Sequence, residues 1–532
     1  LLLRALAGEA VSQSHQTLRE KAFECISLTG FAVSKEKFAP AAAAALKSMF
    51  TTSISQLGQL SDCTSDALKR ICKVLGKDFA DFLPHFVPNI LRVLETDVFT
   101  TDIQGAGDDD LVVAAGDTTI RVKTGQLTEM VALLNILEVF MKHTAEGYIH
   151  PVDFVRPTSE TLTKLLCSNP SSEVSPITSE IRSALYPCWA ELVGLVTPVN
   201  PQLVSELVQN FVDKVGSDLV KADEADEIAS MAMGIVTIIN RAGIGTLRPE
   251  QVNSICELAV AEIRQSFQRD AAVTETTETT EADSQGSTGS TDSAEDEHQC
   301  RTELLSMITA CMKADARTFI ASTWQTLQAL LQQWFVSYGQ LGGKKLALHL
   351  ACDICQHLGE AVNLLAGFMD QIIKALTSRS KEERHWAAFT VNYAARSSAF
   401  SPFAAQATER LKAHLQGDSE TAALLQLCLT HRQCADSDCW AMCLAALPLK
   451  VEMAECRRLN SCLFTEVQSG GLQGLLAARA LGYLCEVYGN KDFCDEELQI
   501  NLNQALRQLP EKAYRDLFSV LTAAQQKKLE RI

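Results

Sequence analysis

The sequence predicts an all-α fold built from a series of similar helix pairs, on three observations. Amphipathic helical patterns recur along the 532-residue chain, β-branched alternation is scarce, and no convincing strand is apparent. Proline also recurs near the start of amphipathic stretches, at Pro40, Pro84, Pro151, Pro201, Pro249 and Pro402. Once two polar inserts are removed, the spacing falls in the range of about 40–47 residues that is typical of HEAT or armadillo repeats. A helical solenoid, which is an extended binding surface, is therefore expected.

The helical period is strictest in two segments. Apolar residues occupy positions i, i+3, i+4, i+7, i+8 and i+11 over 204–215, and the same template recurs over 365–376, so each segment is expected to form one amphipathic helix. Residues that favour the start of a helix stand where helical patterns begin. Asn200 stands before a proline as an expected N-cap, and Ser380 and Glu383 have the spacing of a capping box.

Two inserts divide the chain into five expected regions. HEAT repeats are expected over 1–97, an acidic loop insertion over 98–120 and further HEAT repeats over 121–269. Residues 270–299 contain nine acidic and no basic residues and almost no large apolar side chain. Such a segment cannot bury enough apolar surface to offset its ordering entropy, so a disordered acidic linker is expected there. C-terminal HEAT repeats are expected over 300–532.

Composition indicates an acidic globular protein. Hydrophobic residues make up 47% of the chain, and 65 acidic against 47 basic residues give a net charge of −18. Such a charge disfavours nucleic acid and anionic membranes as partners and favours basic protein segments. The 18 cysteines are scattered along helix faces, as in proteins of reducing compartments. The first residues are not those of a signal peptide, and a start inside a helical pattern is typical of part of a longer protein.

No catalytic signature is convincing. A glycine-rich run at 339–345 resembles a phosphate loop, but it is one residue short, has Lys345 in place of Ser or Thr and follows no strand. Neither a nucleophile elbow nor an HExxH motif is present. An enzyme is therefore not expected, and neither is a cofactor.

Two clusters contain the residue types that bind metals. One comprises His349, Cys352, Cys355 and His357, and the other comprises His431, Cys434, Cys439 and Cys443. On a helix the first cluster would spread around most of the circumference, so one ion could not collect it. The second lies in a less helical stretch and is the better candidate, but its spacings match no common zinc site. Buried thiols without a metal are therefore the expectation for both.

The acidic run Asp108, Asp109 and Asp110 is the candidate partner-binding site. Such a run is either a solvated loop or an acidic finger that contacts a basic partner, and both interpretations stay open.

Several segments resemble the C-terminal half of the importin-β-type receptors in the karyopherin-β family of nuclear transport receptors. They lie in the same order as in that family, at 24–38, 72–94, 120–130, 381–396, 447–455 and 521–532. The acidic run at Asp108–Asp110 leads into the third of these segments and matches an acidic loop of the family. The insertion at 270–299 departs from the family pattern.

The resemblance implies a right-handed superhelix of HEAT repeats and a receptor that shuttles between cytoplasm and nucleus. It implies basic cargo proteins with nuclear localisation signals, FG nucleoporins and the Ran GTPase as partners. In this family the main Ran-binding repeats lie in the N-terminal part, which this sequence does not contain, so no set of Ran or cargo residues carries over. The alternative is a HEAT-repeat scaffold subunit of another cytosolic assembly.

Overall fold

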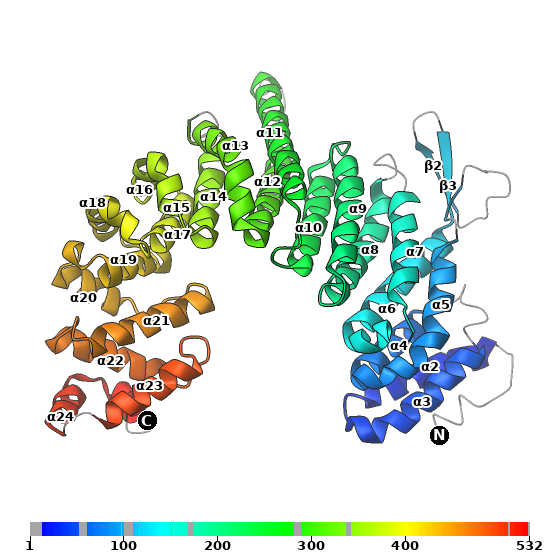
Figure 1. Ribbon diagram of the computed structural model, residues 1–532, viewed down its shortest axis with the longest axis horizontal. Coiled ribbons are helices and arrows are strands. Elements are labelled where there is room, and N and C mark those ends of the chain that lie inside the picture. Colours follow the sequence, from blue (N-terminus) through cyan, green and yellow to red (C-terminus); the bar gives the residue numbers. More distant parts are fainter. Residues whose placement is uncertain are drawn as a thin grey trace. The chain divides into compact units, whose positions relative to one another are not determined.

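A computed structural model describes residues 13–52, 61–96, 98–100, 110–115, 118–150, 152–168, 175–280, 289–336, 342–508 and 511–529. Contacts divide the chain into an N-terminal unit, Leu1–Trp324, and a C-terminal unit, Gln325–Ile532. The described residues of both units are mostly α-helical, which confirms the predicted all-α class (Figure 1). Among them, no helix has both the length and the apolar character that crossing a membrane requires.

The N-terminal unit consists of two layers of helices. In the first layer, each helix packs against the next one in the series α2 (Gln13–Thr29), α4 (Asp62–Leu75), α6 (Thr124–Ile149), α8 (Ser175–Val196), α10 (Ala225–Ala242) and α12 (Gly289–Ala314). The second layer comprises α3 (Lys35–Thr52), α5 (Leu83–Leu94), α7 (Val155–Ser168), α9 (Pro201–Leu219) and α11 (Pro249–Thr280), with the 3-10 helix η2 (Gly76–Phe82) before α5. Alternation between the layers is the arrangement expected of HEAT repeats.

The C-terminal unit continues the alternation. Its first layer is the series α14 (Gly343–His357), α17 (Lys381–Ala394), α19 (Asp418–Thr430) and α21 (Met453–Gln468). Between and after these helices lie α15 (Ala361–Leu364), α16 (Met369–Ala375), α18 (Ser401–Ala413), α20 (Ser437–Ala445), α22 (Gly474–Val487), α23 (Glu496–Arg507), α24 (Glu511–Val520) and α25 (Ala523–Leu529). Three short 3-10 helices are η4 (Ala366–Phe368), η5 (Ser398–Phe400) and η6 (Arg432–Cys434), and α13 (Ala316–Val336) crosses the boundary between the units.

Helix α9 shows how the sequence produces these elements. The apolar residues predicted over 204–215 are all buried, and Asn200 caps the helix by accepting a hydrogen bond from the backbone N–H of Leu203 at 3.2 Å. Ser380 caps α17 in the same way through the N–H of Glu383. Pro40, however, lies inside α3 and does not begin it, and Pro151 lies outside the described residues.

The apolar segment 365–376 forms more than one helix. Its predicted apolar residues are buried, but the chain passes from α15 through η4 into the short helix α16. Because a tight 3-10 turn and an α-helix both place residues three to four apart on one face, the apolar pattern fits the broken arrangement as well as a continuous helix.

A small antiparallel sheet occupies part of 98–122, where the sequence analysis expected a loop and no strand. Strand β3 (Thr118–Val122) pairs with β2 (Leu111–Ala115) on one side and with β1 (Phe99–Thr100) on the other. The register places Leu111 and Phe99 opposite Val122, which is fully buried. Short strands can pair through their backbones with little alternation of apolar and polar residues. The sequence over 98–122 therefore carries no clear strand pattern.

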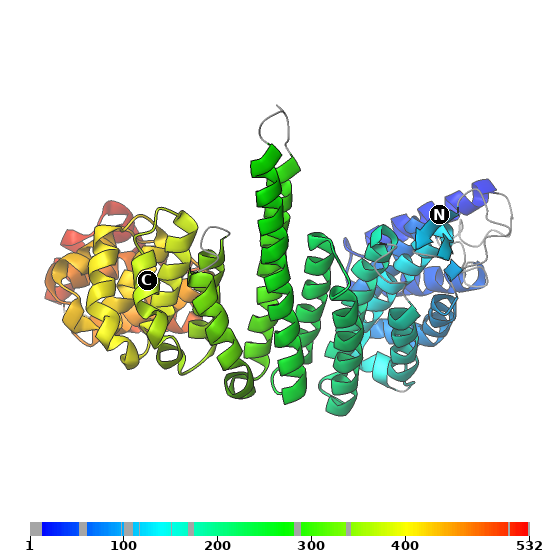
Figure 2. The ribbon, with the colours of Figure 1, turned by 90° about the horizontal axis from the view of Figure 1, so that it is seen from above.

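Helices also replace most of the disordered linker expected over 270–299. Helix α11 continues to Thr280 and α12 begins at Gly289, so that only 281–288 lies outside the described residues. Figure 2 shows the two helices side by side over much of their length. Ion pairs that composition could not reveal join them: Arg269 Nε lies 2.6 Å from Glu297, and Arg301 lies 2.9 Å from Asp270.

One acid at this helix interface lacks a partner. Glu262 in α11 is 1% exposed, and neither of its carboxylate oxygens has a hydrogen-bond partner among the described residues. Burial raises the pKa of Glu262, although the positive charge of Arg269 partly opposes the rise. The two arginines pair with the neighbouring acids Glu297 and Asp270, so Glu262 has no ion pair of its own in this cluster.

The first layer depends on close approach of its helices at glycine. A Cβ atom at Gly234 in α10 would lie 2.5 Å from Cδ2 of Tyr186 in α8. The Tyr186 ring in turn packs edge-on against Phe211 of α9, with 4.9 Å between ring centroids. Since the tyrosine is held between two helices, it cannot move aside without displacing one of them.

We expect Gly234→Ala to destabilise the N-terminal unit by roughly 1–3 kcal/mol, because the clash exceeds the gain in helix propensity. Gly125→Ala is the matched control: this glycine lies in the first turn of α6, and a Cβ there would meet no atom within 4 Å. Urea unfolding followed by circular dichroism measures both. Equal midpoints for the two variants would contradict the proposed close contact.

Glu262→Gln should stabilise the chain at pH 8 and leave its stability unchanged near pH 4. An acid with a raised folded-state pKa is protonated in both states below its ordinary pKa and adds no penalty there. As the pH rises above that value the unfolded state ionises first, so the folded state loses relative stability, and glutamine removes this loss. Unfolding midpoints at the two pH values test this prediction, and an equal effect at both would contradict a raised pKa of Glu262.

Candidate partner-binding surface

The predicted acidic finger is only partly described by the structure. Asp108 and Asp109 lie outside the described residues. Asp110 stands directly before β2, where its carboxylate accepts a 2.8 Å hydrogen bond from Nε of Arg121 in β3. Both side chains are mostly buried. Asp110 is therefore engaged within the sheet, and the partner-binding role of the acidic run stays a prediction.

In the C-terminal unit, α17 presents a row of rings on one face. His385, Phe389, Tyr393 and Arg396 follow one another at helical spacings, with 4.8 Å between the first two ring centroids and 6.4 Å between the next two. The guanidinium carbon of Arg396 lies 4.3 Å above the Tyr393 ring, as in a cation–π contact. His385 and Arg396 are exposed at the two ends of the row, whereas Tyr393 between them is buried.

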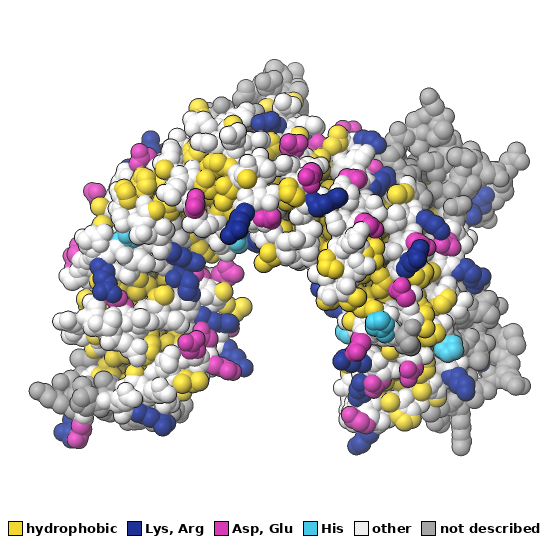
Figure 3. Space-filling model, in the orientation of Figure 1, with side chains coloured by type: hydrophobic (Ala, Val, Ile, Leu, Met, Phe, Trp, Pro, Cys, Tyr) yellow, Lys and Arg dark blue, Asp and Glu magenta, His cyan; other side chains and the backbone are white. Residues whose placement is uncertain are grey.

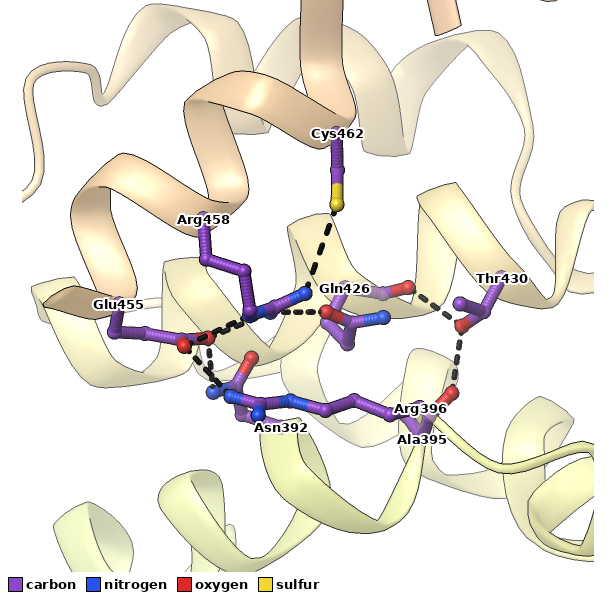
Figure 4. A network of polar contacts seen from close by, with 8 residues as sticks. All are labelled: Asn392, Ala395, Arg396, Gln426, Thr430, Glu455, Arg458 and Cys462. Atoms are coloured by element: carbon purple, nitrogen blue, oxygen red, sulfur yellow. Dashed lines mark hydrogen bonds and ion pairs between the residues drawn. The ribbon is translucent and has the colours of Figure 1, made fainter. Parts of the chain in front are cut away.

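A polar network joins three helices of this first layer (Figure 4). Glu455 of α21 accepts hydrogen bonds from Asn392 of α17 at 2.7 Å, from Arg396 at 2.6 Å and from Arg458 at 2.7 Å. Arg458 also donates to the side-chain oxygen of Gln426 in α19. The network thereby connects three consecutive repeats.

Glu455 carries the negative charge of this network. Its side chain is 4% exposed, and burial alone would raise its pKa. The hydrogen bonds and positive charges of Arg458, Asn392 and Arg396 outweigh burial and lower the pKa of Glu455 below its ordinary value. The carboxylate is therefore ionised at neutral pH and holds both arginines in place.

A cavity of about 490 Å³ lies beside the row of rings, where α17, α19 and α21 begin. Phe389 forms an aromatic part of its lining, together with Lys381, Asp418, Lys450 and Glu452. The lining thus combines one aromatic ring with side chains of both signs of charge, and no catalytic arrangement is apparent among these lining residues.

The structure does not bring the side chains of either His- and Cys-containing cluster together around one point. Among the described residues, no group of three or more His, Cys, Asp or Glu side chains is placed to hold a metal ion. His349 stacks on Trp386 with 3.8 Å between ring centroids, and burial lowers its pKa to about 4. His431 is buried, with Nε2 3.1 Å from the carbonyl oxygen of Ala395. Cys439 and Cys443 are also buried.

The net charge lies entirely in one unit. The N-terminal unit contains 26 basic and 44 acidic residues, whereas the C-terminal unit contains 21 of each, so the first accounts for the whole −18. On the face shown in Figure 3, acidic and basic side chains are interspersed over the described surface rather than gathered in one large patch. The N-terminal unit is thus the part that long-range electrostatic attraction would favour for a basic partner.

Sequence reasoning did not find the Glu455 network, because its members come from three helices that are distant along the chain. The available signal was weak: Asn392 interrupts the apolar side of α17, and a polar residue at such a position needs a buried partner. Which partner it finds depends on how the helices stack.

No protein-family model matches the chain. Importin subunit beta-3 of Saccharomyces cerevisiae is 25% identical over 268 residues, which cover 44% of this chain and 24% of that protein. Crystal structures of Kap121p bound to Nup53p and of Kap121p bound to RanGTP match all of this chain and 49% of theirs, with TM-scores of 0.74 and 0.72 at 15% and 16% identity.

The chain thus spans about half the length of Kap121p. The similarity to these structures confirms the expected HEAT-repeat solenoid fold. The expected resemblance to the karyopherin-β family is confirmed by the importin match together with that fold.

We expect Glu455→Ala to destabilise the C-terminal unit by roughly 2–4 kcal/mol, because two arginines and an amide lose their shared acceptor. The matched control is Glu452→Ala on the same helix end, where the side chain is exposed and makes no capping hydrogen bond. Its effect should stay within about 0.5 kcal/mol. Urea unfolding measures both, and similar losses in the two variants would count against the network.

Proposed function

We propose that this chain, which its sequence and fold relate to the karyopherin-β family, is the C-terminal half of a nuclear import receptor. It binds protein cargo and nucleoporins in a cycle that Ran-GTP regulates, and it shuttles between cytoplasm and nucleus. The observation that carries the proposal is the match of the whole chain to half of Kap121p, a protein whose structures hold Nup53p in one case and RanGTP in another. No enzymatic activity is part of the proposal.

The architecture supports a receptor that changes its pitch. Each helix pair packs mainly against the pairs before and after it in the series, so small rotations at successive interfaces add up along the layers. A receptor that loads and releases cargo needs a change of this kind in its conformation. Cargo and Ran-GTP can oppose each other only if they prefer different conformations of the same chain.

Electrostatics supports a basic cargo. The excess of 18 negative charges lies in the N-terminal unit and would accelerate the encounter with a lysine-rich segment. Because exposed charges are screened over about 8 Å at 0.15 M ionic strength, this attraction depends strongly on salt.

Nucleoporin binding calls for a different interaction. One phenyl ring buried between adjacent helices contributes roughly 1.5–3 kcal/mol before ordering costs are subtracted. Each contact is then weak, and several contacts along one solenoid produce useful avidity while exchange stays fast. Such binding is apolar, so salt should affect it little.

We expect this chain alone to bind an FG-repeat peptide measurably, with little dependence on salt, and to bind a lysine-rich peptide with affinity that falls steeply from low to physiological salt. Its affinity for Ran-GTP should be much lower than that of a full-length receptor, because the family's main Ran-binding repeats precede this part. Fluorescence anisotropy with labelled peptides measures the first two, and pull-down with Ran-GTP measures the third. If neither this chain nor the full-length protein bound either peptide, the result would favour the scaffold alternative.

Replacement of Asp108, Asp109 and Asp110 by Asn tests the acidic run within the same assay. Loss of three charges should weaken the lysine-rich peptide and leave the FG peptide unaffected. Because Asp110 pairs with Arg121, the double variant Asp108→Asn and Asp109→Asn separates recognition from damage to the sheet. Unchanged binding of the basic peptide in both variants would remove the acidic run from the site.

A further inference from the structure

Three thiols meet in the C-terminal unit where α19 packs against α20. Cys428 belongs to α19, whereas Cys439 and Cys443 belong to α20, where a spacing of four residues puts both on one face of the helix. All three side chains are 0% exposed. The thiol of Cys428 is hydrogen-bonded to the thiols of Cys439 and Cys443. We name these three residues the thiol trio.

The arrangement makes Cys428 the shared member of two possible disulfides. Thiols in hydrogen-bond contact need only a small rearrangement to reach the distance of a disulfide bond. Cys428 can bond to one partner at a time, so the third thiol then lies beside the disulfide and can attack it. The bond can therefore pass between Cys439 and Cys443, and the loss of either residue leaves Cys428 with a partner.

The closed structure protects the thiol trio from oxidants. The hydrogen bond with Cys439 lowers the pKa of the Cys428 thiol, but the hydrogen bond with Cys443 and burial outweigh it, so that this pKa is raised overall. The hydrogen bond with Cys428, followed by burial, raises the pKa of Cys439. Because the thiolate is the attacking species in thiol–disulfide exchange, these thiols react slowly while they stay buried. Their oxidation therefore requires α20 to open.

Two features of α20 favour local opening. The helix has nine residues, and helices of this length depend on their packing because they are marginal by themselves. Its N-cap is Asp436, whose carboxylate accepts a 2.8 Å hydrogen bond from the N–H of Cys439 and lies 2.7 Å from Nζ of Lys412. The side chain of Asp436 is 57% exposed, so solvent competes for this cap. Loss of the cap releases the turn that carries Cys439.

A second pair of contacting thiols provides an internal comparison. Cys256 of α11 and Cys311 of α12 are hydrogen-bonded to each other, and both are 0% exposed. Their helices have 32 and 26 residues and are also joined by the ion pairs of Arg269 and Arg301. Opening this interface breaks more contacts than opening α20 does, so it should occur less often. Contact between thiols is thus common to both places, whereas ease of opening distinguishes them.

We propose that the thiol trio is a redox modification site, in which Cys428 forms a disulfide with Cys439 or Cys443 when α20 opens in the presence of a small disulfide such as oxidised glutathione. One protein thiolate attacks the glutathione disulfide, which gives a mixed disulfide and releases one glutathione thiolate. A second thiol of the trio then loses its proton and displaces the other glutathione. Two protein thiols are oxidised to one disulfide, and one glutathione disulfide is reduced to two thiols.

The disulfide ties α20 to α19 and so prevents α20 from opening. Helix α20 also packs against α22, so the bond fixes a contact between consecutive repeats. This part of the C-terminal unit becomes rigid under oxidising conditions and regains its local opening after reduction. All 18 cysteines of the chain are thiols in the structure, which therefore represents the reduced state. The proposal does not depend on the transport function.

The test incubates the whole reduced chain with oxidised glutathione, blocks the remaining thiols with N-ethylmaleimide and maps disulfides by peptide mass spectrometry. We expect disulfides from Cys428 to Cys439 and to Cys443, formed at least tenfold faster than the one between Cys256 and Cys311. Cys439→Ala and Cys443→Ala should each still give a disulfide at Cys428, whereas the double variant should give none. Circular dichroism checks that the variants are folded.

Asp436→Ala keeps the proposal testable if the double variant does not fold, because it removes the cap of α20 without altering a cysteine. It should speed the oxidation of Cys428 at least threefold. Asp495→Ala is the matched control, since Asp495 caps α23 through a 2.8 Å hydrogen bond from a backbone N–H, and it should leave the rate unchanged. Equal rates in the two cap variants would overturn the proposal. So would mixed disulfides at the exposed Cys25 and Cys167 while Cys428 stays reduced in the folded chain.

Discussion

A helix pair in this chain can bury its apolar stripe only against the pairs before and after it. The buried residues of α9 illustrate the constraint: its stripe is covered by α7, α8, α10 and α11, all of which belong to the same or an adjacent repeat. Stability is then a sum of local interfaces and not the property of one central core. The close approach of Gly234 to Tyr186 matters for this reason, because one crossing sets the position of every later repeat relative to every earlier one.

Apolar stripes alone would let neighbouring helices slide, because one aliphatic side chain packs much like another. Buried charges between first-layer helices supply distinct partners. Arg182 of α8 lies 2.6 Å from Glu227 of α10, both nearly inaccessible to solvent, and Glu455 of α21 accepts hydrogen bonds from Asn392 of α17 and from Arg396 just beyond that helix. Buried ion pairs contribute little net stability, because desolvation offsets their attraction. We infer that their consequence is a defined alignment of consecutive repeats.

The two units differ in how they can attract partners. The N-terminal unit holds the whole net charge, so it suits basic segments. The C-terminal unit is electrically balanced, and its row of rings on α17 lies beside a cavity with charges of both signs. Long-range electrostatic attraction therefore belongs to the N-terminal unit, and the short-range features described here belong to the C-terminal unit.

The sequence by itself determined the helical repeat, because periodic apolar residues, N-caps and prolines act within a few turns of one helix. Asn200, Ser380 and the stripe over 204–215 behave as predicted. Tertiary structure decided what depends on contacts between distant segments. The third strand of the sheet near 98–122 forms where β1 meets β3, and Arg269 and Arg301 pair with acids on the facing helix where α11 and α12 enter 270–299. The Glu455 network likewise exists only once repeats stack, since a single sequence does not state which side chains of different repeats will become neighbours.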